Sequence, residues 1–72
     1  MSSEVLLHRA QVARALGVYH YKVMGEMLLY GKRPSVVDGR YYFTRDDVAE
    51  VFERRRLDEL EKACRVIRAY QV

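Results

Sequence analysis

The sequence has a single cysteine, a single proline and no tryptophan among its 72 residues. One cysteine, Cys64, cannot form an internal disulfide, which excludes a disulfide-stabilised fold and fits a reducing compartment. No apolar run approaches the roughly 18 residues that suggest a membrane helix, and the short polar start before Val5 does not resemble a signal peptide. We therefore expect a cytoplasmic protein that makes no membrane contact.

The chain also lacks the residue patterns of catalysis. It shows no paired carboxylates, no nucleophile next to a base and no glycine-rich phosphate loop, so we predict neither enzymatic activity nor a cofactor or small-molecule ligand. His8, His20 and Cys64 do not have the spacing of a zinc site, and we predict no bound metal. Half of the residues are hydrophobic and 32% are charged, a composition typical of one small globular domain.

The net charge of +3 lies entirely in the first 43 residues. Six lysines and arginines oppose three carboxylates up to Phe43, whereas seven basic residues balance seven acidic ones from Thr44 onward. A basic front and a neutral back indicate a polyanionic partner on one side of the molecule. Charge alone does not distinguish DNA from RNA or from an acidic protein.

Two helices joined by a tight glycine turn are predicted between residues 9 and 31. Val12, Ala13 and Leu16 form one apolar stripe over residues 9–16, and Gly17 should end this helix in the left-handed conformation. The second predicted helix spans the stretch between Gly17 and Gly31, followed by a proline that cannot continue it. Its core face carries Val23, Met24, Met27 and Tyr30, and its outer face carries Tyr21, Lys22, Gly25 and Glu26. This layout is that of a helix-turn-helix.

A β-hairpin is predicted around Asp38-Gly39, because this dipeptide between two β-rich runs favours a two-residue turn. The turn places Val37 opposite Arg40 and Val36 opposite Tyr41. Alternation then directs two sets of side chains to opposite faces. The expected core face carries Val36, Tyr41 and Phe43, and the other face carries Val37, Arg40 and Tyr42.

A third helix is predicted from Thr44, whose hydroxyl can cap it while Asp46 and Asp47 occupy the first turn. Its inward stripe is Val48, Val51 and Phe52. The run Arg54-Arg55-Arg56 precedes several acidic residues, which favours a solvated face of salt bridges.

Beyond residue 53 a second apolar seam begins, formed by Leu57, Leu60, Cys64 and Ile67. On a continuous helix this seam points away from the inward stripe, so either the helix breaks near residues 54–56 or the tail offers the seam to a partner. No proline or glycine interrupts residues 44–72, which favours one long helix and a partner. We therefore divide the chain into a domain at residues 1–53 and a helical tail at 54–72, a candidate oligomerisation segment.

Residues 6–52 resemble the excisionase-type helix-turn-helix family, small winged-helix DNA-binding proteins close to the DNA-binding domain of MerR-type regulators. The resemblance rests on the order and spacing of Leu6-Leu7, Gln11-Val12-Ala13, Leu16-Gly17-Val18, Val23, Pro34, Gly39-Arg40-Tyr41, Phe43 and Arg45-Asp46-Asp47-Val48. It implies a mainly α fold with a small β-hairpin, a winged helix-turn-helix, followed here by a long C-terminal helix. In the family, the second helix reads the major groove and the hairpin wing contacts neighbouring phosphates or the minor groove.

Carried over residue by residue, the resemblance gives a set of DNA-binding candidates. It makes His20, Tyr21 and Lys22 the base-side candidates and Arg40 the wing contact. Apart from the resemblance, Lys32 and Arg33 are candidates for DNA-backbone contacts, and Tyr42 is a candidate on the hairpin face that carries Arg40. The family usually has serine or threonine where this chain has His8 and Tyr19, so we expect both helices to lack the usual capping hydroxyl.

Together these observations predict a sequence-preferring binder of double-stranded DNA, either an excisionase-like architectural factor or a small transcription regulator, acting on the nucleoid. A single winged domain reads only a few base pairs, so we expect a homodimer or a cooperative assembly on DNA. The alternative is a protein–protein adaptor in which the helix-turn-helix is a scaffold and the tail docks another protein.

Overall fold

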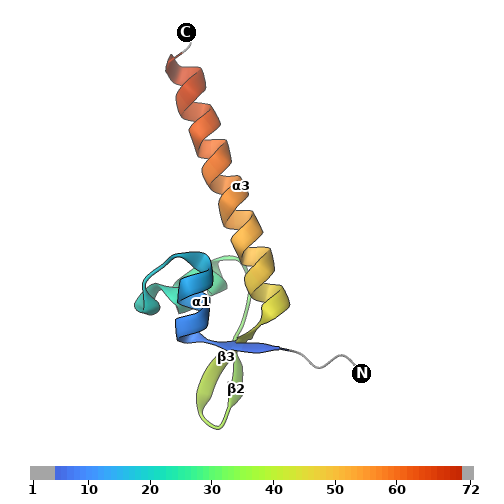
Figure 1. The fold of residues 1–72 in the computed structure, drawn as a ribbon. Helices are drawn as coiled ribbons and strands as arrows, with labels where there is room; N and C mark the ends of the chain where they lie inside the picture. The colour runs from blue at the N-terminus through green and yellow to red at the C-terminus, as the bar shows by residue number, and fades with distance from the viewer. Residues whose placement is uncertain (1–4, 71–72) are drawn as a thin grey trace.

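The computed structural model describes the backbone of residues 5–70 and the side chains of residues 5–65. The described residues form three α-helices, one short 3-10 helix and a three-stranded antiparallel sheet (Figure 1). In chain order these are β1 (Leu6–His8), α1 (Arg9–Leu16), η1 (His20–Lys22), α2 (Val23–Leu29), β2 (Ser35–Val37), β3 (Arg40–Thr44) and α3 (Arg45–Tyr70). The predicted mainly helical fold with a β-hairpin and a long C-terminal helix is confirmed.

The sheet has the strand order β1-β3-β2, and β1 is an element that the sequence analysis did not predict. β1 pairs antiparallel with β3, with Leu7 opposite Phe43 and His8 opposite Tyr42. On the other side of β3, the predicted hairpin register is confirmed, with Val37 opposite Arg40. β3 is therefore the central strand, held between the start of the chain and the hairpin.

The Asp38-Gly39 turn has positive φ at both positions, 50° and 75°. Two consecutive left-handed residues characterise the type I′ turn, whose twist matches that of the flanking strands. The predicted core face of the hairpin is wrong in part: Phe43 is only 2% exposed, but Val36 is 63% and Tyr41 50% exposed. The reason is that the hairpin projects past the helices (Figure 1), so only the end of β3 nearest α3 is covered.

One hydrophobic core joins the three α-helices to β3. Its buried members are Val12, Ala13, Leu16, Val23, Met27, Phe43, Val48 and Val51. Full burial of a valine, methionine or phenylalanine side chain stabilises a fold by roughly 1.5–3 kcal/mol, so these few residues account for much of the folding energy. Phe52, which was predicted to be in this core, is instead 47% exposed. It lies about 100° around α3 from Val51, at the rim beside Leu16 and Gly17.

Local hydrogen bonds fix the beginning and end of α1. Gly17 adopts the predicted left-handed conformation (φ 69°) and its N–H donates to the carbonyl of Ala13. His8 has no capping hydroxyl, as expected, but it caps α1 through its ring: its Nδ1 accepts from the N–H of Gln11 at 3.4 Å, and the His8 N–H donates to Gln11 Oε1 at 3.0 Å. A histidine and a glutamine thus form the reciprocal capping box that serine or threonine usually provides.

The second helix is shorter than predicted. In place of one helix between Gly17 and Gly31, the chain forms the three-residue η1 and then the seven-residue α2. Tyr19, as expected, makes no side-chain capping bond. The predicted glycine end is confirmed, since Gly31 has φ 76° and the next N–H, that of Lys32, donates to the carbonyl of Met27.

The third helix is one unbroken element of 26 residues, as the absence of proline and glycine predicted. Thr44 Oγ1 accepts from the N–H of Asp47 at 3.1 Å, which confirms the predicted cap. Figure 1 shows the C-terminal half of α3 extending away from the other elements, at the end of the molecule opposite to the hairpin. We call residues 57–70 the stalk. Across residues 5–70, no helix combines the length and the apolar character that crossing a bilayer demands.

Candidate nucleic-acid interface

The η1 turn presents three of the predicted DNA-binding residues to solvent, His20, Tyr21 and Lys22. Tyr21 is 75% exposed and its ring stacks on that of Tyr19, with centroids 5.7 Å apart and planes inclined by 8°. The sequence analysis missed this pair, because it placed Tyr19 in the turn before the second helix and Tyr21 on the outer face of that helix. In the structure Tyr19 has extended backbone (φ −70°, ψ 152°), which allows the two rings to lie together.

An open groove of about 570 Å³ separates η1 from the hairpin. It brings together three of the predicted residues, His20, Arg40 and Tyr42. We call it the basic groove, and its lining residues are His8, Arg9, Ala10, His20, Gly39, Arg40, Tyr41 and Tyr42. None of these carries a carboxylate, so nothing within the lining neutralises the two arginines.

The sheet explains why these residues meet. β1 pairs His8 with Tyr42, and α1 begins at the next residue, so Arg9 lies beside the base of the hairpin. Arg40 follows the type I′ turn and faces the groove from the other end. His8 and Arg9 were not predicted as site residues, because only the unexpected strand β1 places them next to β3.

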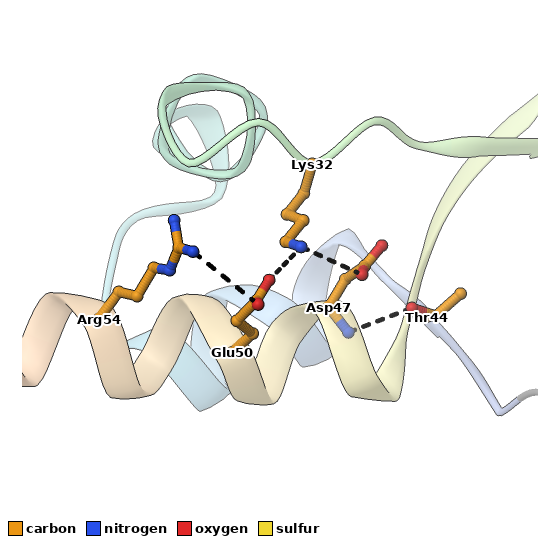
Figure 2. Close-up of polar contacts among 5 residues, drawn as sticks. All are labelled: Lys32, Thr44, Asp47, Glu50 and Arg54. Atoms are coloured by element: carbon orange, nitrogen blue, oxygen red, sulfur yellow. Dashed lines mark hydrogen bonds and ion pairs between the residues drawn. The ribbon is translucent and has the colours of Figure 1, made fainter.

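Lys32 and Arg33 do not line the basic groove. The Lys32 ammonium forms ion pairs with Glu50 and, at 3.8 Å, with Asp47, and Glu50 in turn lies 4.0 Å from Arg54 (Figure 2). The hydrogen bond to Glu50 raises the pKa of Lys32 above its usual 10.5, and the same bond lowers the pKa of Glu50 below 4.5. The charge of Lys32 therefore ties the segment after α2 to α3, and we leave Lys32 out of the interface. Arg33 is exposed on that segment.

The run Arg54-Arg55-Arg56 is not the uniformly solvated face that was predicted. Arg55 donates to the carbonyl of Leu16 at 2.7 Å and pairs with Glu26 at 3.4 Å, so it connects α3 to both shorter helices. Its side chain is only 24% exposed. The sequence analysis missed this role because both partners lie in other elements, far away along the chain.

The stalk carries three exposed apolar side chains of the predicted seam. Leu57 is 53% and Leu60 59% exposed, and Cys64 is an exposed free thiol. Ile67 lies outside the residues whose side chains the structure describes. Where α3 leaves the domain, the hydroxyl of Tyr30 donates to Asp58 at 2.8 Å, which raises the pKa of Tyr30.

A second groove, between α2 and the stalk, has the opposite character to the basic groove. Its lining includes four carboxylates and three basic side chains. The carboxylates are those of Glu26, Asp58, Glu59 and Glu61. This second groove therefore carries negative charges that the lining of the basic groove lacks.

No protein-family model, curated protein or solved structure matches this chain. Within the described residues, no group of three histidine, cysteine or acidic side chains is placed to hold a metal ion. Function must therefore be inferred from the geometry and charge of the basic groove.

Proposed function

We propose that this chain binds double-stranded DNA as a winged helix-turn-helix, with η1 and the start of α2 in the major groove and the β2–β3 hairpin as the wing. The observation that carries the proposal is the basic groove: the η1 turn and the hairpin border one concave surface whose lining contains arginine and histidine but no carboxylate. The resemblance of residues 6–52 to excisionase-type proteins supports the same function.

In helix-turn-helix proteins, the residues at the start of the second helix reach the base edges. Lys22 and Tyr21 occupy that position here, immediately before α2, and both are exposed. Lysine can donate to guanine or to a phosphate, whereas the stacked tyrosine pair offers flat apolar surface and hydroxyls to the backbone. These residues are the base-side candidates of the proposal.

Arg40 and Arg9 complete the proposed interface from the two sides of the basic groove. Arg40 leaves the type I′ turn at the end of the hairpin, where a wing would meet the minor groove or the adjacent phosphates. Arg9 begins α1 on the opposite wall and is placed for a phosphate contact. Such a protein would act on the nucleoid in the cytoplasm.

Titration of duplex DNA of mixed sequence at several salt concentrations tests the proposal. Each phosphate contact contributes a slope of about −0.9 to log K against log salt concentration. We expect steep salt dependence for the native protein, and a slope shallower by about one in Lys22→Ala and in Arg40→Ala where the residue contacts a phosphate.

Two substitutions on α3 serve as matched controls. Lys62→Ala and Arg65→Ala remove the same charges from exposed positions on α3, away from η1, the hairpin and the apolar seam, and we expect both to bind DNA like the native chain. If the affinity of the native protein for duplex DNA did not change with salt concentration, the proposal would be contradicted. Equal losses in the controls and in Lys22→Ala and Arg40→Ala would also contradict it, because they would show that net charge alone governs binding.

The exposed apolar seam of the stalk supports a second candidate function, a protein adaptor. In that case the helical domain would only support the stalk, and Lys22→Ala and Arg40→Ala would have no effect on partner binding. The same salt titration separates the two functions, since an adaptor would show no measurable affinity for duplex DNA.

A further inference from the structure

The stalk exposes an apolar seam that its own domain leaves uncovered. Leu57, Leu60 and Cys64 recur at spacings of three and four residues, and all three are exposed. At about 100° per residue they point away from Val48 and Val51, which face the core. Since α3 is one continuous helix, the seam cannot turn inward, and only another chain can cover it.

We propose that the occupant of the seam is a second copy of this chain, which packs in parallel and in register to form a short two-stranded coiled coil. The spacing of three and four residues is that of the inner a and d positions of a heptad repeat, with Leu57 and Cys64 at a and Leu60 at d. In a parallel arrangement each of these residues meets its own counterpart. In sequence, Ile67 continues the same spacing.

The charges beside the seam distinguish the parallel arrangement from the antiparallel one. Arg56 and Glu61 occupy the flanking g and e positions, and in a parallel pair each g residue faces the e residue five positions later on the other chain. Arg56 of each copy therefore meets Glu61 of the other, which gives two attractive pairs. In the antiparallel register that pairs Leu60 with Cys64, the two copies of Glu61 approach each other and repel.

Arg56 is available for such a pair. It is exposed, and none of the ion pairs among the described side chains involves it. Glu61 has one oxygen 2.9 Å from Arg65 on its own helix, an exposed contact that leaves the second oxygen for a partner.

Glu53 sets the end of the coiled coil that lies nearest the domain. It occupies the d position that precedes Leu57, where two copies would place carboxylates against each other, so the coiled coil begins at Leu57. The two domains then lie at the same end of the assembly. This self-association goes beyond the proposed DNA binding. It is measured without DNA, so the self-association proposal and the DNA-binding proposal can each fail independently of the other.

Disulfide formation between single-cysteine variants tests the orientation. The native chain carries only Cys64, and the variant Leu60→Cys/Cys64→Ala carries only a cysteine four residues earlier. The two full-length chains are mixed in equal amounts, oxidised mildly and identified by the mass of the linked dimers. We expect each chain to link to itself, with little mixed disulfide, because the parallel register places identical positions together.

A predominance of the mixed disulfide would overturn the proposal, since it would show the antiparallel register. An absence of any linked dimer would overturn it as well. The variant Lys62→Cys/Cys64→Ala measures the disulfide formation that random collisions between chains produce, because its thiol lies on the face of α3 away from the seam. Linking of this control as fast as the native chain would also count against the proposal.

Charge reversal supplies a second, independent measurement. Arg56→Glu turns both attractive pairs into repulsive ones, and we expect sedimentation equilibrium to show self-association weakened on the order of tenfold. Arg56→Glu/Glu61→Arg should recover most of the native association. Lys62→Glu makes the same change in net charge away from the seam and should have no effect, with circular dichroism confirming that all variants remain helical. Failure of the double variant to recover association would overturn the parallel pairing.

Discussion

Replacement of Arg55 by alanine should destabilise this protein more than any other change to an exposed or partly exposed charge. The guanidinium donates to the carbonyl of Leu16, at the end of α1, at 2.7 Å. It also pairs with Glu26 of α2 at 3.4 Å. The last carbonyls of a helix have no partner within the helix, so an outside donor is needed where water has little access. One side chain thus satisfies the end of one helix and holds a second against α3.

The expected loss follows from these two contacts. A hydrogen bond from a charged donor contributes about 1.5–3 kcal/mol, and the lower part of this range applies because the side chain is 24% exposed. The pair with Glu26 is also partly solvated and adds about 0.5 kcal/mol. We therefore expect Arg55→Ala to lower the free energy of unfolding by about 2 kcal/mol. For a domain of this size that corresponds to a fall of about 10 °C in Tm.

Thermal and urea denaturation followed by circular dichroism measure this effect, and the next residue provides the control. Arg56→Ala has the same change in side chain and helix propensity, but Arg56 makes no ion pair among the described side chains. At protein concentrations low enough to keep the chain monomeric, its free energy of unfolding should change by less than about 0.5 kcal/mol. Equal stabilities for the two alanine variants would refute the role assigned to Arg55.

Two further predictions concern the same scaffold. Because the Lys32 ammonium lowers the pKa of Glu50 below 4.5, their pairing stabilises the fold at neutral pH and is lost as the pH falls through that lowered pKa. Lys32→Met should therefore reduce the decline in urea midpoint below pH 4.5, and an unchanged acid profile would contradict the assignment. Glycine-to-alanine substitutions should have opposite signs at two positions. Gly25 is exposed within α2 and has open space where a Cβ would lie, so Gly25→Ala should raise the free energy of unfolding by about 0.5–1 kcal/mol. Gly39 has φ 75°, so Gly39→Ala should lower the free energy of unfolding by about 1 kcal/mol. Urea denaturation that gave the same sign for both would refute this reasoning.

The parts of the fold that follow local rules could be predicted from the sequence. Asp38-Gly39 specified both the turn and the register of the hairpin, because few residues other than glycine, asparagine and aspartate tolerate consecutive positive φ values. Gly17 and Gly31 marked helix ends for the same reason. The absence of breakers after Thr44 correctly indicated one long helix.

The parts that depend on distant partners could not be predicted. β1 is three residues long, too short to show a period, and it exists because β3 offers an edge from the other half of the chain. That strand is what brings Arg9 to the basic groove. Lys32 was predicted as a DNA-contact candidate because its partner Glu50 lies in α3, far along the chain. His20, Arg40 and Tyr42 were brought together as a candidate site, while the proposed DNA contacts stay predictions.

The continuity of α3 has a mechanical consequence. A helix without a hinge fixes the rotational phase between the residues that anchor it in the core and those at its far end, since each residue adds about 100° and 1.5 Å. One residue inserted between positions 53 and 56 would turn Leu57 by about a quarter of a revolution relative to the hairpin. An insertion of about seven residues, close to two full turns, would nearly restore the alignment. The continuous helix α3 thus fixes the orientation of the apolar seam relative to the hairpin, which a flexible linker between the domain and the stalk would not do.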